Sequence, residues 1–199
     1  MSSLPPDVLQ SHAAAIRRGD EGAFRQLFDV LYGPLLGFAR SLVRDDAVAE
    51  DLVQEAFVRL WDRRTRLDEE ILLRAWLFRT VRNLALNVRR DSTTRERILD
   101  DPAAVDSAAA PRPAAAPDSA TEHNELHERV SALVTELPPR QREALLLSRV
   151  EGLSHAEVAV AMGCAPRTVN NHLVAALATL RKQLAHVGAL VASAAVWVP

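Results

Sequence analysis

Cysteine is almost absent from the 199-residue sequence, in which Cys164 is the only one. A chain with one cysteine cannot form an internal disulfide bond, and a lone cysteine near a helical turn is most often a small buried residue. The N-terminal residues, MSSLPPDVLQ, lack the basic and then apolar order of a signal peptide, so export is not expected. Both observations predict a cytoplasmic protein.

The sequence also lacks an apolar run long enough to cross a membrane. The tail AHVGALVASAAVWVP, after Leu184, is nearly uncharged but has only 15 residues. A transmembrane helix needs roughly 20. We therefore expect residues 186–199 to form an apolar tail that packs or docks, without membrane insertion.

A strong net charge is missing, because 24 Lys and Arg face 26 Asp and Glu, which gives −2. This average argues against a protein coated in nucleic acid, but it hides an uneven distribution. Residues 71–97 and 137–184 carry +5 and +3, whereas residues 1–70 and 98–136 carry −4 and −6. Two basic stretches separated by an acidic one suit two nucleic-acid contacts better than a single pocket.

The alternating β-branched pattern of strands is scarce before residue 100, where apolar residues recur every three or four positions. This periodicity predicts an all-α protein. Pro, Ala, Asp and Ser dominate residues 98–121, which predicts a flexible acidic linker rich in Ala and Pro. The linker would separate two small helical domains, 10–97 and 122–185, and residues 1–9 would be a disordered N-terminus.

The segment from Ala47 to Trp61 predicts an amphipathic helix. Its expected buried stripe consists of Leu52, Val53, Ala56, Phe57 and Leu60. On the other side, Asp51, Gln54 and Glu55 follow i, i+3, i+4 spacing and form a compact acidic and polar face. Such a face is either simply solvated or offered to a partner.

A second amphipathic helix is expected over residues 68–90. Its buried side would hold Leu73, Leu77, Val81, Leu84 and Val88. Arg79, Asn83 and Arg90 lie opposite, with Trp76 and Asn87 on the shoulder. Guanidinium groups pair with phosphates, and an aromatic ring can stack on an exposed base, so this face suits nucleic acid. The alternative is an ordinary solvated face with Trp76 in the core.

Residues 152–184 predict two helices around a tight turn. Ser154 and Glu157 have the spacing of a capping box at the start of the first helix. Gly163 permits the turn, and Pro166 suits the start of the second helix. The apolar residues expected to pack are Val158, Val160 and Ala161 on the first helix, and Val169, Leu173, Ala176 and Leu180 on the second.

The second of these helices points Arg167 and Asn171 away from its apolar side. Thr168 and His172 lie on one shoulder and Asn170 on the other. A row of Arg, Thr, Asn and His near a helix N-terminus has the chemistry for base and phosphate contacts in a major groove. Helix-turn-helix geometry also occurs in plain helical packing, which remains the alternative.

Three stretches carry a family resemblance: DAVAEDLVQEAFVRLW from Asp46, LRAWLFRTVRNLALNVRR from Leu73, and LPPRQREALLLSRVEGLSHAEVAVAMGCAPRTVNNHL from Leu137. In this order they resemble the extracytoplasmic-function sigma factors of bacterial RNA polymerase, group 4 of the sigma-70 family. The resemblance extends from about Ala23 to Leu184 and implies two helical domains, a region 2 bundle and a region 4 helix-turn-helix.

The resemblance also implies a role for each stretch. The first would dock on the polymerase clamp through Asp51, Gln54 and Glu55. The second would recognise and help melt the −10 promoter element, with candidate residues Trp76, Arg79, Arg82, Asn83, Asn87, Arg89 and Arg90. The third would bind the −35 element through Arg167, Thr168, Asn170, Asn171 and His172.

Core RNA polymerase and promoter DNA are the implied partners, and an anti-sigma factor is a further candidate. No catalytic residue, cofactor, metal or small-molecule substrate is expected. A sigma factor draws much of its DNA affinity from the polymerase, so its own surfaces need be only modestly basic. The chain departs from many relatives at Ala175 and Ala178, where Arg is common, and at Asn170, where Lys is frequent, so phosphate anchoring would be weaker here.

Two other interpretations stay open on sequence grounds. The C-terminal half also resembles the helix-turn-helix of response regulators, although such regulators carry an α/β receiver or a ligand-sensing domain in place of helices. An enzyme would have to use His123, Glu125 and His127, where two imidazoles at i, i+4 could hold a metal. This is not the H-E-x-x-H order of zinc proteases, and a solvated helix start beside the linker explains these residues better.

Overall fold

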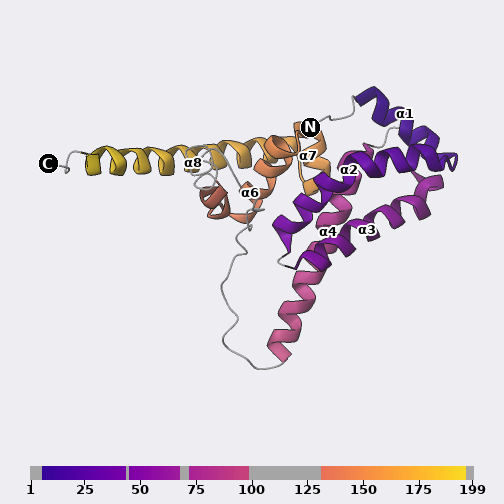
Figure 1. The fold of residues 1–199 in the computed structure, drawn as a ribbon, viewed down its shortest axis with the longest axis horizontal. Coiled ribbons are helices and arrows are strands. Elements are labelled where there is room, and N and C mark those ends of the chain that lie inside the picture. Colours follow the sequence, from indigo (N-terminus) through magenta and orange to yellow (C-terminus); the bar gives the residue numbers. More distant parts are fainter. Residues whose placement is uncertain (1–5, 44, 68–71, 99–130, 196–199) are drawn as a thin grey trace.

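The computed structural model describes residues 6–43, 45–67, 72–98 and 131–195, which are almost entirely helical (Figure 1). The N-terminal helices are α1 (Pro6–Arg17), α2 (Glu21–Leu42), α3 (Asp46–Arg63), the 3-10 turn η1 (Arg64–Arg66) and α4 (Leu73–Ile98). The C-terminal helices are α6 (Pro139–Leu145), the π turn η2 (Leu146–Val150), α7 (His155–Met162) and α8 (Pro166–Ala195). The prediction of an all-α fold is confirmed.

Several boundaries differ from those expected. Helix α1 begins at Pro6, so it includes residues that the sequence assigns to a disordered N-terminus. Helix α4 starts at Leu73 and continues to Ile98, beyond the expected end at residue 90. Helix α8 runs through most of the apolar tail, to Ala195. The acidic linker beyond Ile98 lies outside the described residues, as do His123, Glu125 and His127.

The helices of the described ranges are not suited to crossing a membrane, because none of them is both long and apolar enough to do so.

Aspartates fix the starts of the two central helices. The side chain of Asp20 accepts a hydrogen bond from the Ala23 N–H at 3.0 Å, at the start of α2. Asp45 accepts from Ala47 and Val48 at 2.8 and 3.2 Å, at the start of α3. Each carboxylate satisfies amide groups that lack a partner within the helix and complements the positive end of the helix dipole.

Helix α3 packs as its apolar stripe predicts. All five residues of the stripe are buried: Leu52, Val53, Ala56, Phe57 and Leu60. Phe57 also lies against Phe28 of α2, with ring centroids 4.7 Å apart. The stripe faces α2 and α4, so the polar face of α3 is turned away from the bundle.

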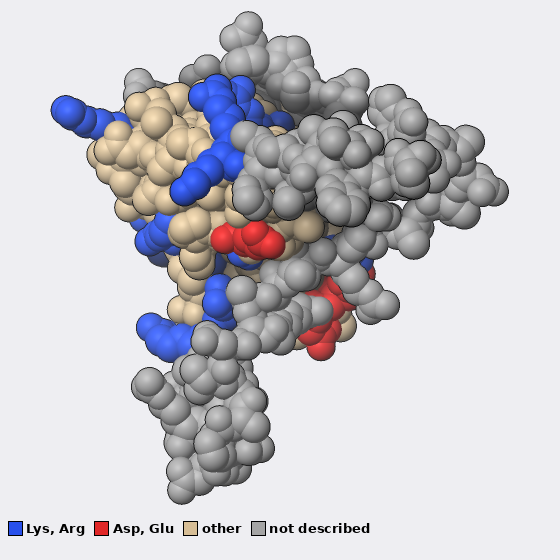
Figure 2. Space-filling model, turned by 90° about the vertical axis from the view of Figure 1, so that its left-hand side faces the viewer, with Lys and Arg blue, Asp and Glu red and all other residues tan. Residues whose placement is uncertain are grey.

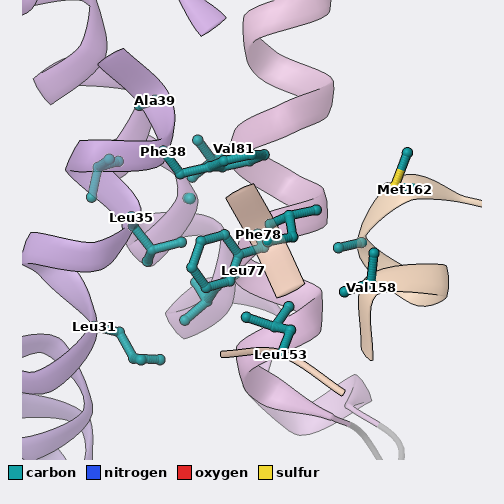
Figure 3. Close-up of a cluster of buried hydrophobic side chains, with 14 of the residues drawn as sticks. Leu31, Leu35, Phe38, Ala39, Leu77, Phe78, Val81, Leu153, Val158 and Met162 are labelled. Carbon is teal, nitrogen blue, oxygen red and sulfur yellow. The ribbon is translucent and has the colours of Figure 1, made fainter. Parts of the chain in front are cut away.

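Helix α4 is covered on two sides, because α2 and α3 pack on one side and α7 on another. Leu73, Leu77 and Val81 are buried as expected, and Leu84 is half-buried. Ala75, Phe78 and Ala85 are buried as well. Figure 3 shows α4 side chains between those of α2 and those of α7 and the turn before it.

The expected burial of Val88 is wrong. Its side chain is 38% exposed, because the C-terminal part of α4 extends away from the helices that cover its first turns (Figure 1). The apolar periodicity of α4 therefore continues past the end of its packing partners.

The helix-turn-helix is present. Ser154 and Glu157 form a reciprocal capping box at the start of α7, and Gly163 ends this helix at φ 64°, in the left-handed region that glycine adopts without strain. Helix α8 starts at Pro166. Val160 is 37% exposed, contrary to expectation, and Cys164 is half-buried against the core. Val169, Leu173 and Ala176 are buried, and Leu180 is half-buried.

Candidate nucleic-acid and polymerase interfaces

The outward face of α3 contains all three residues assigned to polymerase docking. Asp51, Gln54 and Glu55 are exposed, because the opposite side of the helix is buried in the bundle. Glu55 accepts a hydrogen bond from Arg59 Nε at 2.7 Å, so part of its charge is already compensated within the helix. Asp51 and Gln54 are therefore the stronger candidates for contact with a basic partner.

The open face of α4 contains most of the residues assigned to the −10 element. Five of the seven share this face by helical spacing: Trp76, Arg79, Asn83, Asn87 and Arg90. Arg79 and Asn83 are exposed, while Trp76 is half-buried against the core. The Arg90 Nη2 donates to Asn87 Oδ1 at 3.4 Å. The face thus combines an aromatic edge, amides and guanidinium groups.

Arg82 does not share the open face. It is only 8% exposed, and its Nε donates to the Glu143 carboxylate, which belongs to α6 and is itself 7% exposed. The sequence places Arg82 among DNA-binding candidates, but in this structure its guanidinium is paired and covered. Burial of such a pair is tolerated because each charge satisfies the other.

Arg89 lies on the same side of α4 as Arg82 by helical spacing. It is exposed, and its charge acts on Arg142 of α6. Burial and the nearby positive charge of Arg89 both lower the pKa of Arg142, burial being the larger cause. Arg142 nevertheless donates hydrogen bonds to the backbone oxygens of Val134, Thr135 and Leu137, which fixes the start of α6.

The N-terminal part of α8 presents the residues assigned to the −35 element. Arg167, Asn170 and Asn171 are exposed, while Thr168 and His172 are half-buried. Arg167 and Asn171 lie opposite Val169 and Leu173, which pack in the core, and Asn170 lies on the shoulder of the helix. Contacts to DNA through these three side chains would leave the packing of α8 undisturbed.

On the face of the molecule that Figure 2 shows, basic side chains lie at several places among the described residues, and acidic side chains form smaller patches. In the sequence, the positive balances belong to residues 71–97 and 137–184, which include most of α4 and the C-terminal helices as far as Leu184. A surface of this kind attracts the phosphate backbone without regard to sequence.

Sequence patterns missed three exposed or paired residues of these surfaces. Val58 is 53% exposed and continues the face of Asp51, Gln54 and Glu55 by one helical turn. Val174 is 58% exposed and continues the face of Asn170 and Asn171 in the same way. Glu143 was not singled out, although Ala75, Phe78, Arg82 and Ala85 form a second stripe on α4 whose spacing indicates a covering partner.

Comparison with known families places the chain in one class of protein. Residues 27–95 match the model of sigma-70 region 2, and residues 127–180 match the model of sigma-70 region 4. The chain is 30% identical to the ECF RNA polymerase sigma factor SigL of Mycobacterium tuberculosis, over 82% of this chain and 90% of SigL. The chain belongs to the sigma-70 family. It is an RNA polymerase sigma factor of the extracytoplasmic-function type.

Other members of the sigma-70 family give the same result. The chain is 34% identical to the probable RNA polymerase sigma factor RfaY of Xanthomonas campestris, over 87% of this chain but only 42% of that relative's length. A solved structure of the sigma factor RpoE from Bartonella quintana, in complex with the anti-sigma factor NepR, superposes with a TM-score of 0.61. It is 27% identical and covers 81% of this chain and 96% of its own.

Membership of the sigma-70 family excludes the response-regulator interpretation left open by the sequence. A response regulator would carry an α/β receiver or a sensing domain before the helix-turn-helix, but residues 27–95 match sigma-70 region 2 and are helical where the structure describes them. The matches of both regions cover the stretches on which the resemblance was based.

Proposed function

We propose that this sigma factor binds its partners through three separate faces. The acidic face of α3 docks on core RNA polymerase, the open face of α4 contacts the −10 promoter element, and the N-terminal part of α8 binds the −35 element. The observation that carries the proposal is that all three residue sets have exposed members opposite buried apolar stripes. Substitutions on these faces can therefore change binding without changing the fold.

The chemistry of each face supports its assignment. Asp51 and Glu55 offer negative charge to a basic partner surface. Arg79 and Arg90 can pair with phosphates, and Asn83 and Asn87 can bond with bases that leave the stack. Arg167 near the start of α8 suits a phosphate, whereas the amide of Asn171, one turn further, suits a base edge.

The protein acts by binding, in the cytoplasm with the polymerase, and has no catalytic activity of its own. The solved relative RpoE is in complex with an anti-sigma factor, so we include an anti-sigma factor among the partners of this chain.

The polymerase contact is tested by combining Asp51→Arg with Gln54→Ala. Reversing the charge and removing the amide should weaken binding to core polymerase by at least about 30-fold, the effect of losing an interface hot spot. Because both residues are exposed, the free energy of unfolding should change by less than about 0.5 kcal/mol. A pull-down with core polymerase measures the first quantity, and thermal unfolding measures the second.

The matched control is Glu136→Arg, which reverses an exposed acid outside α3. It should leave polymerase binding unchanged, so that a general charge effect can be separated from docking. Undiminished polymerase binding by the folded α3 double variant would contradict the assignment of this face.

A further inference from the structure

The two parts of the chain share one core. Phe78 of α4 is fully buried and lies edge-to-face against Phe38 of α2, with ring centroids 5.3 Å apart. On another side of α4, Figure 3 shows Val158 and Met162 of α7 and Leu153 of the turn before it, all of them buried. The contact between α4 and α7 therefore removes apolar surface from water. This burial favours the closed arrangement, in which the C-terminal helices pack against α4.

Polar groups link the same elements across this interface. Arg82 of α4 pairs with Glu143 of α6, and the Arg74 Nη2 donates to the backbone oxygen of Glu151, just before α7. The Arg140 Nη1 lies 3.5 Å from the second carboxylate oxygen of Glu143, but its side chain is 54% exposed. Arg82 is thus the buried partner of Glu143, and it comes from the other half of the chain.

We propose that the Arg82–Glu143 pair is an intramolecular clasp, which holds the C-terminal helices against α4 and withdraws Arg82 from DNA in the free chain. The DNA part of this inference rests on the proposed role of α4 at the −10 element. While the clasp is closed, Arg82 cannot reach a phosphate, because its guanidinium is both paired and covered. Full engagement of α4 with DNA therefore requires that the two halves separate.

The geometry also predicts which change opens the clasp. Replacing Glu143 leaves the Arg82 charge buried without its partner, which is far less favourable than burial of the pair. In the separated state Arg82 is hydrated, so the same change has little effect there. Glu143→Gln should shift the equilibrium toward separation, and Glu143→Lys should shift it further because it places two positive charges together.

The state of the full-length chain can be followed by single-molecule energy transfer between dyes on Asp62→Cys in α3 and Lys182→Cys in α8, with Cys164→Ala to remove the native thiol. Both labelling sites are exposed. We expect one high-transfer population in the otherwise unchanged chain. In Glu143→Gln, the low-transfer population should grow by at least about tenfold, given the effect of unpairing a buried charge.

The control is Glu136→Gln, which makes the same chemical change at an exposed site in the turn before α6, where the carboxylate accepts a hydrogen bond from Gln183 of α8. It should leave the transfer distribution unchanged. Exchanging the charges, with Arg82→Glu and Glu143→Arg together, should restore part of the high-transfer population lost in Glu143→Lys. Circular dichroism checks that each variant stays helical.

Two results would overturn the clasp: a broad, low-transfer distribution in the chain with native Arg82 and Glu143, or an unchanged distribution in a folded Glu143→Lys variant. The first result is measured on the chain with native Arg82 and Glu143. The clasp can therefore be tested even if a Glu143 variant fails to fold. Binding of a labelled random-sequence single-stranded DNA is measured in parallel, and we expect it to strengthen severalfold in Glu143→Gln. Opening without stronger DNA binding would support the clasp and count against the role of α4 at the −10 element.

Discussion

Helices α3 and α4 have similar sequence patterns but different surroundings. Each has an apolar stripe and an outward polar face. Helix α3 has only one covered side among the described residues, and Asp51, Gln54 and Glu55 are exposed opposite its buried stripe. Helix α4 has a second covered side, which faces the buried Leu153 and Val158 and where Arg82 pairs with Glu143. One amphipathic pattern therefore leaves open how many neighbours a helix has.

The largest effect is expected from breaking the doubly covered part of α4. Phe78→Ala should lower the free energy of unfolding by about 3–5 kcal/mol, because the side chain is fully buried and packs against Phe38 of α2. Val88→Ala, on the exposed part of the same helix, should stay within about 0.5 kcal/mol. Urea unfolding measures both. Similar losses for the two variants would show that α4 is not packed as described.

Local features of these helices could be predicted from the sequence, but their burial could be predicted only in part. The stripe of α3, the capping box at Ser154 and the turn at Gly163 are local features, and the structure confirms them. The burial of Val88 and Val160 was predicted from periodicity alone, and it is wrong because no neighbouring element covers them enough.

Arg82 marks the limit of sequence reasoning more clearly. Its place on α4 follows from the sequence, but its pairing depends on Glu143, which is 61 residues away. A charged residue within an apolar stripe indicates a buried partner, although it does not identify that partner. The functional roles of all three faces remain predictions, since they depend on contacts with molecules outside this chain.

A second prediction uses α8, whose N-terminal face is open like that of α3. Asn171→Ala should change which −35 sequences are transcribed, while Arg167→Ala should weaken all of them, at about 1–3 kcal/mol per lost contact. Transcription by reconstituted holoenzyme from promoters varied only at the −35 element measures both. If neither variant alters any promoter, the N-terminal part of α8 only packs.

Val174 sharpens this prediction, because it lies on the same face and is 58% exposed. An apolar side chain in the major groove can contact the methyl group of thymine. Val174→Ser should therefore reduce a preference for thymine at one −35 position, with polymerase binding unchanged. The matched control is Val150→Ser, since Val150 is equally exposed but lies on η2.

A third prediction concerns the open face of α4. Replacing both Asn83 and Asn87 with Ala removes two amides that would bond with unstacked bases, at roughly 0.5–1.5 kcal/mol each. Open-complex formation on duplex promoters should fall by about tenfold, with a smaller loss on pre-melted promoters. Equal losses on both templates would indicate a role other than melting. The energy-transfer distribution of the dyes on α3 and α8 should not change, because both residues lie away from the side of α4 that holds Arg82.

A last prediction concerns the dependence of the closed arrangement on pH. Burial raises the pKa of the Glu151 carboxyl to about 7 from its ordinary 4.5, and the positive charge of Arg74 opposes this shift only in part. Once the helices separate and water reaches the carboxyl, its pKa should return toward the ordinary value. The closed state therefore favours the protonated form, so it should weaken as the pH rises from about 4.5 to about 7 and change little above that. The dyes on α3 and α8 should report more of the closed state at pH 5.5 than at pH 7.5. Glu151→Gln should flatten this dependence, whereas an unchanged slope in that variant would assign it to another titrating group.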